Sequence, residues 1–120
     1  MSSSYTSNSG IELIPTGAQV GTWGSTTNTN FQIIDRAVNG VGTIALTGTT
    51  YSLDTSDGAL SEGQYNVLVF TGTPGGACTV TINPSDQQKT FFINNSSDQD
   101  VVLTQGSGGD VTISAGKTGI

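Results

Sequence analysis

The side chains of this chain that could do chemistry are carboxylates, because it has nine Asp and Glu residues and no histidine. Three of them, Asp54, Asp57 and Glu62, fall in the stretch LDTSDGALSEG. Paired carboxylates hydrolyse glycosidic bonds when they stand about 5 to 9 Å apart across a sugar-sized cleft. A chain this short has little material to wall such a cleft. We therefore favour turn-forming Asp and a solvated Glu over weak calcium binding or catalysis.

The other reactive groups are few. Without histidine, Ser-His-Asp and Cys-His catalysis and the usual zinc sites are excluded. The single cysteine, Cys78, opens an alternating apolar stretch, which predicts a small buried side chain rather than a reactive thiol. The glycine-rich segments TGTPGGA and GSGGD lack the Gly-Lys-Ser/Thr ending of a phosphate-binding loop. We predict a protein that is not an enzyme and that needs no cofactor or metal.

The charge of the chain limits its partners. Only 10% of the 120 residues are charged, the formal net charge is -6, and the cations are Arg36, Lys89 and Lys117. Nucleic-acid binding needs clustered Lys and Arg, and a membrane span needs about 20 apolar residues, so neither partner is expected. The start, MSSSYTSNSG, lacks the basic and apolar regions of a secretory signal. We therefore expect that the chain is not exported by the general secretory route.

The chain divides into three segments. Residues 1–10 have no aliphatic residue after Met1 and predict a flexible arm. Residues 11–41 form a docking segment with one helix, and residues 42–120 form a β-domain around a single core. A weak internal echo, GGACTVTINPSDQQKT beside GGDVTISAGKT, suggests that the natural chain continues past Ile120 with another apolar strand.

The helix is predicted from a capping pattern and a 3.6-residue period. Thr29 and Gln32 have the spacing of a capping box, Asn28 is a rival cap, and Gly40 is a natural stop. Apolar residues recur on one face, at Phe31, Ile34, Val38 and Val41. Because a helix of about three turns is marginal alone, that face must pack on a sheet or on another subunit. The predicted interface residues are Trp23, Phe31, Ile34 and Val38.

After Gly42 the period shifts toward two and predicts seven strands, at 43–47, 51–53, 65–71, 78–82, 90–94, 101–105 and 111–114. Apolar residues on both faces of QYNVLVF make it the central strand. We predict a mainly-β fold, a small antiparallel β-sandwich or meander, because two copies of the echo are too few for a solenoid. Loops 54–63, 71–77 and 105–110 are expected to face outward with Asp54, Asp57, Glu62, Pro74 and Ser107.

Several short motifs occur together in a familiar order. They are GTWG at 21–24 with Asn28 and Asn30, IIDRAVNG at 33–40, Asp57-Gly58 before NVLVFTG, TVTI at 79–82, Lys89 before FFINN, and AGKT at 115–118. In this order the chain resembles a family of phage tail-fibre or virion structural proteins found in marine and cyanobacterial phages. The resemblance implies a trimeric, non-enzymatic subunit located in the virion, with capsid, portal or tail components as partners.

Two alternatives remain open at this stage. The chain could be a capsid decoration or head-fibre protein, or a carbohydrate-binding module that attaches to host surface glycans. Independently of the resemblance, a chain with 17 glycines and few large side chains buries little apolar area, which favours stabilisation by a subunit interface.

Overall fold

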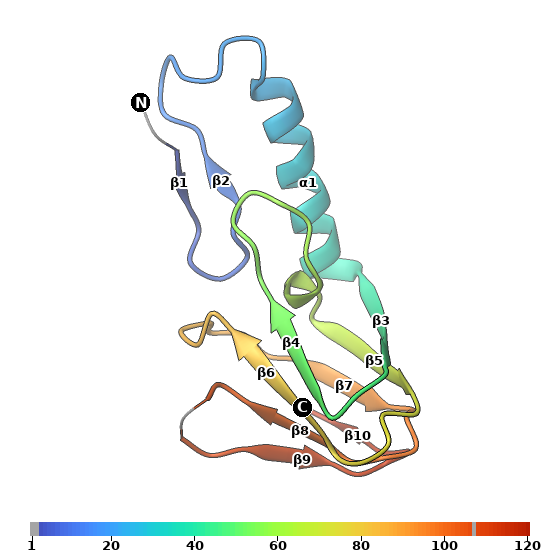
Figure 1. Ribbon diagram of the computed structural model, residues 1–120. Coiled ribbons are helices and arrows are strands. Elements are labelled where there is room, and N and C mark those ends of the chain that lie inside the picture. Colours follow the sequence, from blue (N-terminus) through green and yellow to red (C-terminus); the bar gives the residue numbers. More distant parts are fainter. Residues whose placement is uncertain (1–2, 107) are drawn as a thin grey trace.

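The computed structural model of the chain describes residues 3–106 and 108–120. These residues form one α-helix, a short 3-10 helix and ten strands in three sheets. Figure 1 shows the helix and a two-stranded hairpin at one end of the molecule and two larger sheets at the other. The molecule is elongated, with extents of 50 × 26 × 22 Å.

The two larger sheets are built by a chain that passes from one to the other and back. Three parallel strands of the first sheet are β3 (Val41–Leu46), β5 (Val67–Gly72) and β7 (Phe92–Asn95). Three parallel strands of the second are β4 (Thr50–Asp54), β6 (Cys78–Asn83) and β8 (Val101–Thr104). From β3 to β8, consecutive strands therefore lie in different sheets. We call each pair of consecutive strands, one from each sheet, a β-coil. Each β-coil stacks on the one before it.

The last two strands reverse this direction. β9 (Val111–Ile113) pairs antiparallel with β8, and β10 (Thr118–Gly119) pairs antiparallel with β7. The sheet orders are β10-β7-β5-β3 and β4-β6-β8-β9. The two reversed strands, β9 and β10, therefore cover one end of the stack of three β-coils.

The predicted antiparallel sandwich or meander is therefore wrong: the fold is mixed α/β with mostly parallel sheets. All seven predicted strands exist near their expected positions, so the error is in their connection. Alternation with a period of two is the same in parallel and antiparallel strands. The short turn at 47–49, which resembles a hairpin turn, instead carries the chain from β3 to β4 in the other sheet.

One core lies between the facing surfaces of the two sheets. Both sheets contribute to a single buried cluster, with Ile44, Leu68, Phe70 and Ile93 from the first and Leu53, Cys78, Val80, Val101 and Leu103 from the second among its members. β5 lies between β3 and β7, as expected for the central strand. Cys78 is completely buried, and desolvation raises the pKa of its thiol.

Asn95 is a fully buried polar residue at the edge of this core. Its Nδ2 donates to the carbonyl oxygens of Gln99 and Ile113, each at 2.8 Å, and its Oδ1 accepts from the backbone and hydroxyl of Ser97. The side-chain amide of Asn95 therefore connects the turn after β7 to β9. Its nitrogen and its oxygen both have hydrogen-bond partners, as burial requires.

The helix α1 spans Trp23–Asn39, with Thr22 as N-cap and Gly40 as C-cap. Its end agrees with the prediction, but its start is about two turns earlier, so Thr29 and Gln32 lie inside the helix and form no capping box. The polar run from Asn28 to Asn30 is helical because tertiary contacts override its weak helix propensity. Asn30 makes two hydrogen bonds with the backbone of Glu12, described below.

The N-terminal residues, predicted as a flexible arm, are paired in the structure. β1 (Ser4–Tyr5) is antiparallel to β2 (Glu12–Leu13), and the Gly10 carbonyl accepts from the amide of Gly58 at 2.6 Å. The buried side chain of Gln64, in the 3-10 helix η1 (Glu62–Gln64), donates to the Ser9 carbonyl at 3.0 Å. The hairpin therefore packs on the loop that follows β4.

Candidate functional site

The outward face of α1 carries its largest apolar side chains. Phe31 is 64% exposed and Val38 is 70% exposed, and Trp23 and Ile34 are exposed as well. At 3.6 residues per turn these four side chains fall within an arc of about 80° around the helix axis. The four residues predicted as an interface thus share one solvent-facing side of the helix.

A second group of exposed apolar side chains lies on the first sheet. Val41 begins β3 two residues after the helix ends, and its register partners are Val67 in β5 and then Phe92 in β7. All three side chains are exposed, and Phe92 is 48% exposed. We call the seven residues the apolar stripe: Trp23, Phe31, Ile34, Val38, Val41, Val67 and Phe92.

The sequence analysis missed two members of this stripe, Val67 and Phe92, and assigned Val41 to the helix. Their signal is a recurrence of large apolar residues after 26 and then 25 residues, at Val41, Val67 and Phe92. That recurrence has meaning only when the strands are known to be parallel and in register. The expected antiparallel order concealed it.

Polar contacts attach α1 to the rest of the chain. Asn30 Oδ1 accepts from the backbone N–H of Glu12 at 2.9 Å, and its Nδ2 donates to the Glu12 carbonyl at 2.8 Å. Near the helix end, Asn66 Nδ2 donates to the Ala37 carbonyl at 2.7 Å. The helix is therefore held at its middle and near its C-terminal end.

Arg36 adds a third attachment. Its Nη1 donates to the Ser61 carbonyl at 2.9 Å, and its guanidinium lies 4.4 Å from the centre of the Tyr65 ring. Ile33, beside it on the inward side, is the buried residue of the helix. A cation-π contact of this kind contributes about 0.5–2 kcal/mol. These attachments make the orientation of the stripe a property of the fold.

The predicted outward-loop residues do not gather in one place. Because β4, β6 and β8 are parallel, loop 54–63 and loop 105–110 lie at one end of the second sheet and loop 71–77 at the other. Asp54, Asp57 and Glu62 lie in the loop that meets the N-terminal hairpin. Pro74 is buried rather than outward, and Ser107 lies outside the described residues.

Two of these three carboxylates, Glu62 and Asp54, accept local hydrogen bonds. The Tyr51 hydroxyl donates to Glu62, and burial together with this carboxylate raises the pKa of the phenol. Asp54 accepts from Ser52 Oγ at 2.6 Å and from Asn83 Nδ2 at 3.1 Å. These bonds fit the interpretation of a structured turn.

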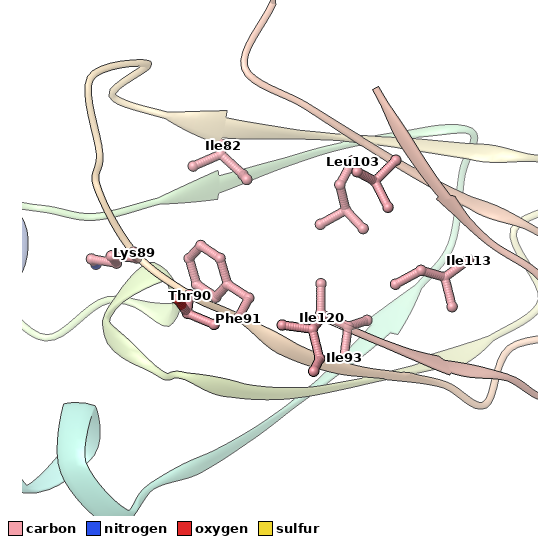
Figure 2. A pocket seen from close by; sticks show the side chains of 9 residues that line it. Ile82, Lys89, Thr90, Phe91, Ile93, Leu103, Ile113 and Ile120 are labelled. Atoms are coloured by element: carbon pink, nitrogen blue, oxygen red, sulfur yellow. The ribbon is translucent and has the colours of Figure 1, made fainter. Parts of the chain in front are cut away.

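An apolar cavity of about 320 Å³ opens between the two sheets near the closing strands. Figure 2 shows Ile82 and Leu103 on one side and Phe91, Ile93 and Ile120 on the other, with Lys89 at one end. The Lys89 ammonium donates to Thr55 Oγ1 at 3.1 Å and to the Gly63 carbonyl at 2.6 Å, and burial lowers its pKa to about 8. With its cation committed to these acceptors, the cavity has little to orient a polar ligand.

Within the described residues, no group of three or more His, Cys, Asp or Glu side chains is placed to hold a metal ion. The one α-helix described is neither long nor apolar enough to cross a membrane. Comparisons of the chain with protein-family models, with curated proteins and with solved structures found no match. The resemblance to phage tail-fibre proteins therefore stays a prediction from the sequence motifs.

Proposed function

We propose that this chain is a non-enzymatic structural subunit that assembles as a homotrimer and serves as a tail-fibre or appendage component of a phage particle. The observation that carries the assembly is the apolar stripe, which the fold fixes on the outside of the molecule. Exposed apolar surfaces of this kind mark interaction sites. The assignment to a virion is supported by the sequence motifs alone.

The spacing within the stripe favours a copy of the same chain as the partner. Within α1, Phe31, Ile34 and Val38 follow one another at intervals of three and four residues, and Trp23 lies eight residues before Phe31. Intervals of three and four are the a/d repeat by which helices of a coiled coil insert side chains between those of their neighbours. Around a three-fold axis, each copy of α1 would meet an identical apolar seam.

The sheet extends the proposed contact beyond the helix. A coiled coil of one 17-residue helix is only about 25 Å long. The column of Val41, Val67 and Phe92 adds apolar area beside the end of that helix, on a rigid parallel sheet. Closed rotational symmetry would cover this column in every copy and leave none of it exposed.

The oligomeric state tests this proposal. We expect sedimentation equilibrium of the wild-type chain to give three times the 12.2 kDa chain mass. The Ile34→Glu variant places a charge in the seam and should weaken association at least about a hundredfold, which corresponds to about 3 kcal/mol.

Gln32→Glu is the matched control, because it adds the same charge to an exposed position outside the apolar stripe. It should leave the trimer intact. A wild-type chain that stays monomeric at high concentration, or equal effects of the two variants, would contradict the proposed interface.

The virion assignment needs a separate measurement. Antibody labelling of purified phage particles that carry this gene should place the chain on the tail or an appendage. Labelling over the head would instead support the capsid decoration or head-fibre alternative. Particles without the chain would contradict a virion role while leaving the assembly result unaffected.

A further inference from the structure

The two ends of the stack of β-coils differ in their edge strands. At one end the edge strands are β9 and β10, which are only three and two residues long. At the other end they are β3 and β4, with six and five residues. A long edge strand has unpaired N–H and C=O groups that can pair with another chain, and natural proteins usually protect it. The first β-coil is therefore the end of the stack where a further strand can add.

The free side of β3 has a defined set of backbone groups. The Ile44 carbonyl oxygen lies 3.5 Å from Thr71 Oγ1 and so points toward β5. Because successive residues of a strand direct their N–H and C=O groups to opposite sides, those of Thr43 and Ala45 point away from β5. No hydrogen bond from another described segment reaches them. In Figure 1, β3 lies at the margin of the molecule, and α1 leads away from its first residue rather than along it.

β5 presents an equivalent row of backbone groups to β3. The Phe70 carbonyl of β5 accepts from a backbone amide on the side of β7, so the residues before and after it face β3. These residues, Val69 and Thr71, are the register partners of Thr43 and Ala45. The free side of β3 therefore offers the same row of donors and acceptors that holds β3 itself on β5. The complement of this row is the backbone of an extended peptide, whose own groups recur with the same two-residue spacing.

We propose that the free edge of β3 binds an extended, uncharged segment of another protein, which adds a fifth strand to the first sheet. The sequence of β3, VGTIAL, has no charged residue and no proline, two of the features that prevent such pairing in natural edge strands. The other edge strand of this coil, β4, ends in the exposed carboxylate of Asp54. The edge of β3 is therefore the one that is open to a partner.

The side chains beside the added strand restrict its sequence. Ile44 and Leu46 are buried in the core, and Leu53 of the other sheet belongs to the same buried cluster. Every second residue of the added strand lies beside these side chains and must be apolar. The residues between them lie beside Thr43 and Ala45, which are exposed. The partner segment therefore alternates apolar with small or polar residues along the six positions of β3.

A second copy of this chain is a poorer occupant than a different protein. Two identical edge strands pair with each other antiparallel about a two-fold axis, which a closed three-fold assembly does not contain. The choice of occupant therefore rests on the proposed trimer, whereas the open edge does not. Sedimentation equilibrium reports the trimer separately, so failure of one proposal is distinguishable from failure of the other.

Amide hydrogen exchange of the full chain tests whether the edge is open. We expect the amides of Ile44 and Leu46, which face β5, to exchange at least about a hundredfold more slowly than those of Thr43 and Ala45. Protection of Thr43 and Ala45 at every protein concentration would show that the chain covers its own edge. Protection that rises with concentration would show that a second copy covers it. Either result would overturn the proposal.

A synthetic peptide serves as the probe for the added strand. It has the sequence VGTIAL with two lysines at each end for solubility, because β3 is the strand that occupies the corresponding row of β5. We expect saturable binding with a Kd of about 1 mM, and slower exchange at Thr43 and Ala45 only. The same peptide with proline in place of isoleucine carries the same charge and should not bind. No protection by the first peptide, or equal protection by both, would contradict strand addition.

Two substitutions of Ala45 localise the binding. Ala45→Pro removes an outward N–H without breaking a bond to β5, and Ala45→Lys adds a charge at the edge. Each should weaken binding of the peptide at least about tenfold. Ala115→Lys is the matched control, because it adds the same charge at an exposed position between β9 and β10. The lysine variant keeps the test valid if the proline variant does not fold. Wild-type affinity in Ala45→Lys would overturn the proposal.

Discussion

The β-coils and the helix α1 treat their apolar residues in opposite ways. All twelve residues of the buried cluster lie between Ile44 and Ile113, so the coils complete their core without the helix. The helix buries Ile33 and exposes Trp23, Phe31 and Val38. The coils are thus stabilised from within, whereas the helix is attached by polar contacts and leaves its apolar side exposed to solvent.

The largest effect that tests this contrast is the loss of one phenylalanine from each region. Phe70→Ala removes a completely buried ring from the coils and should lower the free energy of unfolding by about 3–5 kcal/mol. Phe31→Ala removes an exposed ring, so in the dissociated chain it should change that free energy by less than about 0.5 kcal/mol. Chemical denaturation at several protein concentrations measures both.

Concentration separates the two roles further. In the proposed trimer the unfolding midpoint rises with protein concentration, and Phe31→Ala should flatten that rise. Phe70→Ala should lower the midpoint at every concentration. Similar losses from both variants in the dissociated chain would show that the helix belongs to the same core as the coils.

Substitutions of two glycines, one in the β-coils and one in the helix, test the same contrast through backbone conformation. Gly72 ends β5 with φ of +99°, and a Cβ there would clash with the carbonyl oxygen of Leu46. Gly72→Ala should therefore lower the free energy of unfolding by more than the roughly 1–2 kcal/mol that the left-handed conformation alone costs an alanine. Gly24 lies in the helix with open space around it, so Gly24→Ala should stabilise the chain by up to about 1 kcal/mol.

Thermal melting of the two glycine variants measures these effects. Opposite signs are expected, with the decrease for Gly72→Ala larger than the increase for Gly24→Ala. Equal and small changes would mean that the turn after β5 relaxes freely, which would contradict tight packing of the coils.

A smaller effect depends on pH and reports on Lys89, where the coils meet the loop after β4. Burial lowers its pKa from 10.5 to about 8, so between these values the unfolded chain holds a proton that the folded chain has lost. The free energy of unfolding should therefore rise with pH across this window, and below pH 8 this contribution should be constant. Lys89→Met should abolish the rise.

The measurement is the difference between the stability curves of wild type and Lys89→Met from pH 7 to 10.5. Tyr51 and Cys78, whose pKa values are raised, act in the opposite direction at the alkaline end, but they are present in both proteins and cancel. Lys117→Met, at an exposed position, should follow the wild-type curve. If the stability of Lys89→Met changed with pH in parallel with that of the wild type, the burial of this ammonium would be contradicted.

Local features of the fold could be predicted from the sequence, and long-range ones could not. The seven strands and the end of the helix at Gly40 follow from alternation and glycine placement. The parallel order does not, because it depends on which sheet each short turn enters. The helix begins earlier than its capping pattern predicts, and its bonds from Asn30 to Glu12 join residues 18 positions apart, which no local propensity contains.

The candidate sites divide in the same way. The exposed positions of Phe31, Ile34 and Val38 were accessible to helical periodicity, whereas Val67 and Phe92 required the register of the sheet. The bond between Gln87 and Ser7 was out of reach, because the two residues are 80 positions apart in the sequence.

The repeating step of the β-coils makes the length of this protein adjustable. In-register partners recur after 26 and then 25 residues, and each coil adds about 4.8 Å, the distance between neighbouring strands, along the stacking direction. Inserting one such segment before the reversed strands β9 and β10 would lengthen the rod while leaving its two ends unchanged.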